Sequence, residues 1–399
     1  MTQKPDPHRW AKAHPELGEG PLSIEPYVSP AWFEAEREKI FKAQWLCVGR
    51  QEEVANPGDY KIKRIHVAGT SAIMIRGKDD RIRAFHNICS HRGNTVLNEE
   101  GDETFGQCGG AIITCRFHNW AYAADGRLIG VPHDRGFYDC FNKADSGLAE
   151  IHCDMWEGFI FICLAERPPM PLAEYLGDYG RHFAGFPYQE MSLGFTYRTY
   201  LQCNWKVAID AFQETYHVPF LHRSFPHTTP SGPRNFKTFG PHRSCGIMIS
   251  YTGEPSRTAT LAADLARSSL VTRPQEVTLP SAMNPDRDPN YAFELSCCFP
   301  NFLLHVAEGI WFSNTFWPIS HDRCLWEGRY HVRPPRSHSE RWAIEHSIVL
   351  QRNTWLEDTA TMENTQRAMM SGAKKFQILQ DDEILIRHGY TSVERFVHG

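Results

Sequence analysis

The 399-residue sequence lacks several features that would assign it to common classes of protein. A membrane-spanning helix takes about 20 apolar residues, and the longest apolar run, residues 159–164, is far shorter. The amino terminus has no apolar signal region. The chain has no run of basic residues, and 42 Lys and Arg against 47 Asp and Glu give a net charge of −5. We therefore expect no membrane or nucleic-acid partner and a cytoplasmic location.

Other absences concern cofactors and disulfides. No glycine-rich dinucleotide fingerprint follows a predicted strand, so the chain is not expected to bind NAD(P)H itself. Without a secretory signal, the 12 cysteines are expected to be core thiols, metal ligands or catalysts rather than disulfides. The hydrophobic fraction of 41% and charged fraction of 22% are those of a globular protein with room for two domains.

Two compact pairs of potential metal ligands lie in a β-rich stretch of the sequence. Cys89 and His91 are two residues apart, and Cys115 and His118 are three apart, so each pair has one thiolate and one imidazole. Two Cys and two His suit a tetrahedral zinc ion, and they also suit a Rieske [2Fe–2S] cluster. In common zinc fingers each local pair of ligands is either two Cys or two His, whereas here each pair has one of each. The mixed pairs therefore favour the cluster.

A second candidate site lies in the middle of the chain. A helical pattern predicts one helix with Asp210, Glu214 and His217 on one face. Pro219 is expected to end or kink that helix before His222, which lets both imidazoles turn toward one point. Two histidines with a nearby carboxylate match the triad that holds non-haem ferrous iron. The local pattern alone leaves a polar surface or core role equally open.

Together these motifs resemble those of the α subunits of Rieske non-haem iron aromatic-ring-hydroxylating oxygenases. The shared patterns are Cys-x-His-Arg-Gly, Cys-x-x-His-x-Trp, Asn-Trp-Lys before Glu-x-x-His-x4-His, and Asp-x4-Glu-x2-Gln near the carboxyl terminus. The resemblance implies that the ligands of the [2Fe–2S] cluster are Cys89, His91, Cys115 and His118, and that those of a mononuclear Fe(II) are His217, His222 and Asp358. Asn119 replaces the family's glycine, and because Asn tolerates positive φ we expect the same turn.

The resemblance also implies roles for the neighbouring acids. Glu214 matches the carboxylate that bridges the histidine ligands of cluster and iron across a subunit interface. Asp210 is expected to support the iron site from nearby. Glu357 is the neighbour most easily confused with the ligand Asp358. Most members of the family have Asp at the position of Glu214, and some amine-oxidising members have Glu, which is a hint toward demethylation.

The implied fold is α+β, with a β-rich Rieske domain inserted before a helix-grip catalytic domain, an antiparallel sheet around a long C-terminal helix. We expect an N-terminal helical segment over 1–45 that packs on the catalytic domain, a Rieske domain over 46–165 and a catalytic domain over 166–399. Residues 230–290 are expected to hold loops that cover the substrate.

The implied function is that of a terminal mono- or dioxygenase component. It would use O2 and electrons from a separate NAD(P)H-dependent flavin reductase, a ferredoxin or both, to hydroxylate or oxidatively demethylate an organic substrate. An aromatic substrate is favoured, as in aromatic compound catabolism, and the implied assembly is an α3 or α3β3 trimer. A Rieske electron carrier is one alternative, although it would not need the iron triad. A zinc-stabilised helix-grip binding protein is the other.

Overall fold

The computed structural model describes residues 8–222, 228–251, 256–272 and 279–399. The chain divides into two compact units, one made of Met1–Glu36 and Leu176–Gly399 and the other of Arg37–Tyr175. We call them the catalytic unit and the cluster unit. The domain limits given above stay a prediction. No helix in the described parts of the chain is long and apolar enough to cross a membrane.

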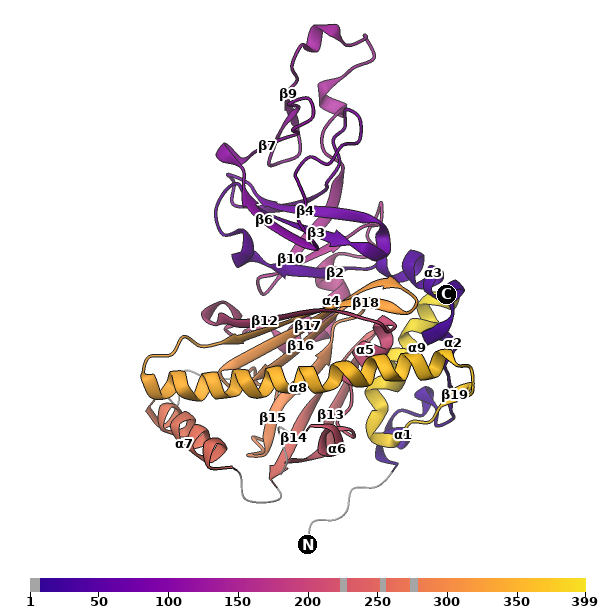
Figure 1. The fold of residues 1–399 in the computed structure, drawn as a ribbon, viewed down its shortest axis with the longest axis vertical. Helices are drawn as coiled ribbons and strands as arrows, with labels where there is room; N and C mark the ends of the chain where they lie inside the picture. The colour runs from indigo at the N-terminus through magenta and orange to yellow at the C-terminus, as the bar shows by residue number, and fades with distance from the viewer. Residues whose placement is uncertain (1–7, 223–227, 252–255, 273–278) are drawn as a thin grey trace. The chain divides into compact units, whose positions relative to one another are not determined.

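The cluster unit is built almost entirely from antiparallel strands (Figure 1). Its larger sheet has the order β2-β11-β10-β5-β4-β3-β6 and its smaller one the order β7-β8-β9. The strands are β2 (Leu46–Arg50), β3 (Asp59–Ile65), β4 (Thr70–Arg76), β5 (Ile82–His86), β6 (Glu103–Gln107), β7 (Ile112–Thr114), β8 (Ala121–Ala123), β9 (Leu128–Gly130), β10 (Glu150–Trp156) and β11 (Phe159–Cys163). Every residue of β11 is buried, so the longest apolar run of the sequence forms a core strand.

The hairpin between β10 and β11 follows from its two turn residues. Glu157 and Gly158 have φ values of 49° and 78°, and Trp156 pairs directly with Phe159. A two-residue turn with both central φ values positive matches the right-handed twist of the strands that it joins. The turn therefore fixes the register of β11 against β10. In the sheet, β11 lies between β10 and β2.

The catalytic unit contains one seven-stranded antiparallel sheet in the order β12-β18-β17-β16-β15-β14-β13. The strands are β12 (Ser192–Leu201), β13 (Thr228–Phe239), β14 (His242–Tyr251), β15 (Tyr291–Cys297), β16 (Phe302–Ala307), β17 (Ile310–Ser320) and β18 (Arg323–Val332). A 33-residue helix, α8 (His338–Met370), lies across one face of this sheet (Figure 1). This arrangement of sheet and helix confirms the predicted α+β fold.

Helix α8 approaches the sheet very closely at Gly328. The side chain of Ser337 caps its first turn by accepting a hydrogen bond from the backbone N of Glu340. Its buried residues Trp355, Asp358, Met362 and Gln366 recur at helical spacing and form one stripe. A Cβ atom on Gly328 of β18 would come within 2.6 Å of the Trp355 ring, so glycine allows this close approach.

Two predictions about the segment that carries Asp210 and His217 are wrong. Helix α5 runs only over Trp205–Ala211, and α6 covers Val218–Leu221, so Asp210 and His217 do not share one helix face. Pro219 does not end a helix; it lies in the first turn of α6, where proline's missing N–H costs no hydrogen bond. Residues 230–290 hold most of β13, all of β14 and the helix α7 (Arg257–Thr272) rather than loops alone. Within that range, 252–255 and 273–278 lie outside the described residues.

The N-terminal segment forms hydrogen bonds with both α5 and α8. Tyr27, in α2 (Glu25–Val28), donates its hydroxyl proton to Asp210 of α5 at 2.7 Å, and its backbone O accepts from Gln366 of α8 at 3.0 Å. Glu36, at the end of α3 (Pro30–Glu36), accepts from Trp205 Nε1 at 2.8 Å and from Lys206 Nζ at 2.6 Å. Both of these donors belong to the Asn-Trp-Lys motif.

Candidate metal centres

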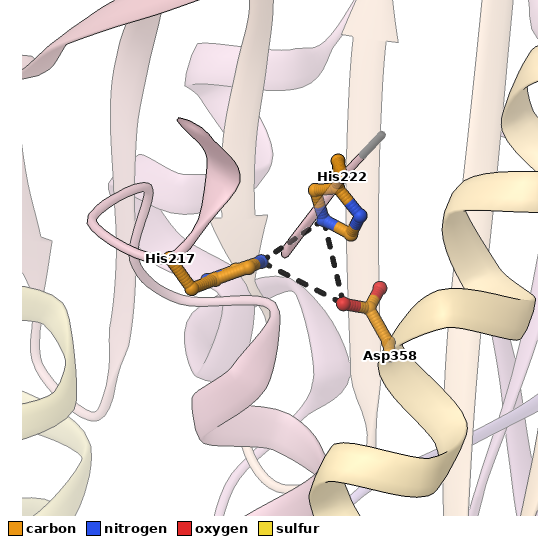
Figure 2. Close-up of side chains that lie close together, drawn as sticks. All are labelled: His217, His222 and Asp358. Atoms are coloured by element: carbon orange, nitrogen blue, oxygen red, sulfur yellow. Dashed lines mark hydrogen bonds and ion pairs between the residues drawn. The ribbon is translucent and has the colours of Figure 1, made fainter. Parts of the chain in front are cut away.

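Three side chains of the catalytic unit direct donor atoms toward one point (Figure 2). The Nε2 atoms of His217 and His222 lie 3.1 Å apart, and they lie 3.6 and 3.4 Å from Oδ1 of Asp358. Three donors on one face of an octahedron, each about 2.1 Å from the metal, would be about 3 Å apart. Asp358 Oδ1 is buried and accepts no hydrogen bond from any described residue. The group therefore fits a divalent metal ion.

Each histidine of this triad has a carboxylate on its other ring nitrogen. His217 Nδ1 is hydrogen-bonded to Glu214 Oε1, while Glu214 Oε2 accepts from the backbone N of His217 at 3.1 Å. His222 Nδ1 lies 3.0 Å from Glu357 Oε2. Because an ionised carboxylate only accepts hydrogen bonds, each Nδ1 carries the proton and each Nε2 is left free to bind a metal.

Burial and charge shift the pKa values of these groups in different directions. Burial lowers the pKa of His217, but the Glu214 carboxylate raises it above its ordinary value. Burial lowers the pKa of His222, and Glu357 offsets only part of that change. Burial also raises the pKa of Asp358 to about 7, against the opposing charge of His217. Metal binding must therefore displace a proton from a partly protonated Asp358 at neutral pH.

Asp210 lies beside this group but does not contact either histidine in the structure. Its carboxylate accepts from the Tyr27 hydroxyl, and burial raises its pKa to about 7. A cavity of ≈ 250 Å³ is lined by Asp210, Glu214, His217, Asp358 and other residues of the catalytic unit. Asp210 therefore faces the same cavity as His217 and Asp358, and its supporting role stays a prediction.

The four predicted cluster residues lie on two loops of the cluster unit. Cys89 follows β5 and Cys115 follows β7, and both thiols are buried within one apolar core. The rings of His91 and His118 have centroids 4.6 Å apart. The buried Trp120 stacks on the His91 ring with centroids 4.9 Å apart, whereas His118 is exposed.

The turns and hydrogen bonds around the thiols suit a bound anionic cluster. Asn119 and Gly93 have φ values of 56° and 74°, which confirms that Asn119 keeps the turn expected of glycine. The Tyr122 hydroxyl lies 3.1 Å from Cys89 Sγ. Burial raises the pKa of the Cys89 thiol, and the neighbouring Cys115 raises it further.

The spacing of these donors distinguishes the two candidate metal centres. A tetrahedral zinc ion holds all four of its donors within about 4 Å of one another. Among the described residues, only His217, His222 and Asp358 bring three such donor atoms within 4.8 Å. The donors of Cys89, His91, Cys115 and His118 form no group of three as compact as this one, which disfavours a single zinc ion.

Comparisons with known proteins agree with both centres. Residues 181–399, more than half of the chain, match the family model described as "Ring hydroxylating alpha subunit (catalytic domain)". Residues 44–142 match the model of the Rieske [2Fe-2S] domain. The chain therefore belongs to the family of ring-hydroxylating α subunits. The cofactors of these two domains are a Rieske [2Fe–2S] cluster and a mononuclear iron, as the sequence predicted.

Similar curated proteins include monooxygenases and dioxygenases. The carnitine monooxygenase oxygenase subunit of Acinetobacter baumannii is 32% identical over 206 residues, 50% of this chain and 52% of the relative. The large oxygenase component of the naphthalene 1,2-dioxygenase system of Pseudomonas aeruginosa is 31% identical over 202 residues, 48% of this chain and 42% of the relative. The chain thus spans about half the length of the curated relatives that it matches.

Two solved structures share the fold over nearly the whole chain. A quaternary ammonium Rieske monooxygenase gives a TM-score of 0.72 at 21% identity, covering 93% of this chain and 94% of that one. Naphthalene 1,2-dioxygenase from Rhodococcus sp. gives 0.74 at 18% identity, covering 98% of each chain. These likenesses confirm the predicted combination of a Rieske domain and a catalytic domain.

Proposed function

We propose that this chain is the terminal oxygenase component of a multicomponent Rieske oxygenase. It would use O2 and electrons from a separate NAD(P)H-dependent reductase to hydroxylate or oxidatively demethylate an organic substrate. The observation that carries the proposal is the triangle of His217, His222 and Asp358, with its unpaired buried carboxylate oxygen, in a chain that also has the Cys/His loops. A Rieske electron carrier would have no use for that triangle.

We assign the residues as follows. Cys89, His91, Cys115 and His118 hold the cluster, and His217, His222 and Asp358 hold the iron. When bound, the two centres supply electrons that reduce O2 beside the substrate. The protein orients the two imidazoles through Glu214 and Glu357, and three protein ligands would leave room at the metal for O2.

Glu214 is also proposed to carry electronic contact between subunits of a homotrimer, by bridging to a histidine of the cluster of the partner subunit. Its side chain is 12% exposed, and two nearby aromatic residues, Tyr216 and Phe220, are 59% and 78% exposed. Exposed apolar groups beside a functional carboxylate are typical of a surface that another chain covers. One similar solved protein is described as giving insight into inter-subunit electron transfer.

The lining of the cavity beside Glu214, His217 and Asp358 supports an organic substrate with apolar groups, because Val207, Leu221 and Met362 also line it. An aromatic substrate stays our prediction. The names of the relatives include both aromatic and quaternary ammonium substrates.

The twelve cysteines, all within the described residues, form no disulfide in the structure, which supports the proposed cytoplasmic location.

Metal analysis of the purified protein tests this proposal. An oxygenase should contain about three irons and about two acid-labile sulfides per chain. About two irons with two sulfides would indicate the electron carrier, and zinc without sulfide the binding protein. Substrate-dependent NADH consumption with an added reductase, followed by product mass, then identifies hydroxylation or demethylation.

A further inference from the structure

The segment between α5 and α6 has little regular backbone structure of its own. Residues 212–217 belong to neither helix. Among the described residues, the backbone N–H groups of 214–216 donate no hydrogen bond to another backbone group. This segment nevertheless carries Glu214 and His217, and His217 projects from it toward the other two members of the triad (Figure 2). Side-chain contacts must therefore hold the segment in place.

The side chain of Gln213 anchors this segment to the sheet. Gln213 is 0% exposed and directly precedes Glu214. Its Oε1 accepts a hydrogen bond from Arg243 Nε at 2.8 Å, and its Nε2 donates to the backbone O of Phe212 at 3.3 Å. An arginine N–H can only donate, so the amide atom that faces Arg243 is the oxygen. Both polar atoms of this buried amide are thus paired.

Arg243 lies on a strand that is paired on both sides. It belongs to β14, where it pairs with Thr238 of β13 and with Cys297 of β15. Arg243 is 2% exposed. A Cβ atom on Gly389 of α9 (Ile384–His398) would come 2.8–3.1 Å from the guanidinium atoms, so the guanidinium lies directly against this helix. The sheet and α9 therefore leave the guanidinium little room to move.

The bond between Gln213 and Arg243 bears on the metal triad through the next residue. Glu214 holds both Nδ1 and the backbone N of His217. A shift of the backbone at Gln213 would move the Glu214 carboxylate and, with it, the His217 ring. His217 Nε2 would then leave its position 3.6 Å from Asp358 Oδ1. Loss of a group that orients a metal ligand typically lowers metal affinity roughly 10- to 100-fold.

We propose that Gln213 and Arg243 are positioning residues of the mononuclear metal site, an inference that rests on the proposed oxygenase function. Arg243 donates from the sheet to Gln213, and Gln213 fixes the segment that presents Glu214 and His217. Neither residue is a metal ligand, and neither lines the cavity beside the triad. Their hydrogen bond supplies the rigidity that a continuous helix through this segment would otherwise give.

Metal affinity tests the proposal without measuring turnover. Competition with an iron chelator measures how tightly the mononuclear site binds Fe(II), and sulfide content shows that the cluster is intact. Gln213→Leu removes the acceptor, and Arg243→Met removes the donor. Each should lower iron affinity about tenfold. Because both changes break the same contact, the double variant should lose no more affinity than the weaker single variant.

Gln213→Glu is the conservative variant, since a carboxylate oxygen also accepts from Arg243 Nε. It should bind iron like wild type, and it keeps the buried contact if Gln213→Leu fails to fold. A loss of iron affinity in Gln213→Glu as large as that in Arg243→Met would overturn the proposal.

Ser296→Ala is the matched control for a general loss of stability. Ser296 is 0% exposed on the neighbouring strand β15, where its hydroxyl lies 3.0 Å from the Tyr179 hydroxyl and donates to the backbone O of Leu304 at 2.6 Å. This variant should unfold at lower urea concentration and keep wild-type iron affinity. Wild-type affinity in both Gln213→Leu and Arg243→Met, additive losses in the double variant, or an equal loss in Ser296→Ala would contradict the positioning role.

Titration with Co(II) separates this proposal from the oxygenase function. Imidazole and carboxylate ligands bind Co(II) whether or not the protein reacts with O2. A protein without mononuclear iron, whose Co(II) affinity falls in Gln213→Leu and Arg243→Met, would contradict the oxygenase function and support the positioning role. An active oxygenase whose metal affinity is unchanged in both variants would contradict the positioning role alone.

Discussion

His222 Nδ1 lies 3.0 Å from Oε2 of Glu357, the residue directly before Asp358 in α8. Adjacent residues of a helix point about 100° apart, so Glu357 reaches the far side of the imidazole whose near side faces Asp358. One turn of α8 therefore supplies both a proposed metal ligand and the group that orients another ligand. The sequence interpretation treated Glu357 only as a competitor of Asp358 for the metal.

Glu357→Ala should weaken the binding of mononuclear iron. Without its carboxylate, His222 can rotate or change tautomer, and loss of such an orienting group typically lowers metal affinity roughly 10- to 100-fold. Competition with an iron chelator measures the change. Glu345→Ala, an exposed carboxylate on the same helix, is the control and should bind iron normally. Equal iron affinity in both variants would show that Glu357 does not orient the ligand.

Asp358→Ala should lose mononuclear iron and keep the cluster. Two imidazoles alone bind ferrous iron weakly, whereas the cluster ligands lie in the other unit of the chain. Iron should fall by about one per chain, with sulfide content and visible absorption unchanged. An unchanged iron count would remove Asp358 from the ligand set.

The candidate metal ligands could be proposed from the sequence because they occur in short motifs with residue types that few other sites require. The groups that support them could not. Tyr122 is 33 residues from Cys89, and Tyr27 is 183 residues from Asp210, so no local pattern joins either pair. The sequence also did not predict the break after α5. The apolar and polar residues of 212–217 follow a pattern that a helix could have, but the backbone leaves helical geometry at Phe212.

Tyr122→Phe should lower the reduction potential of the cluster. The Tyr122 hydroxyl lies 3.1 Å from Cys89 Sγ, and a hydrogen bond to a ligand sulfur stabilises the more negative, reduced state. Loss of about 1 kcal/mol of this preference corresponds to a decrease on the order of 50 mV for one electron. Voltammetry of the purified protein measures it. The variant keeps the aromatic ring. A reduction potential equal to that of wild type would therefore mean that the Tyr122 hydroxyl does not hydrogen-bond to the Cys89 sulfur.

Asn119→Val should destabilise the second cluster loop. Asn119 has a φ of 56°, a conformation that costs a β-branched residue on the order of 1–3 kcal/mol. Asn119→Gly should be tolerated, because glycine adopts this φ without strain. Cluster loss on warming, followed by visible absorption, should occur at a lower temperature in the valine variant than in the glycine variant. Identical loss in both would contradict the backbone explanation.

Asp210→Asn should change how stability depends on pH. The pKa of Asp210 is about 7 in the folded protein against 3.8 in the unfolded chain, so the folded state holds an extra proton between these values. The protonated Asp210 carboxyl group therefore stabilises wild type at low pH. This contribution to the free energy of unfolding, up to about 4 kcal/mol, is lost as pH rises toward 7. Urea unfolding at pH 5 and pH 8 should show this loss in wild type and not in the variant. Equal pH dependence in both proteins would mean that Asp210 ionises normally.

The hydrogen bonds of Tyr27 and Glu36 also affect the order of folding during synthesis. Their partners Asp210, Lys206 and Gln366 lie 170 to 339 residues downstream. Residues Arg37–Tyr175 are complete 191 residues (366 − 175) before Gln366 is added, an interval of roughly 10–40 s at bacterial or eukaryotic translation rates. The cluster unit can therefore fold, and receive its cluster, while Tyr27 and Glu36 still lack their partners on α5 and α8.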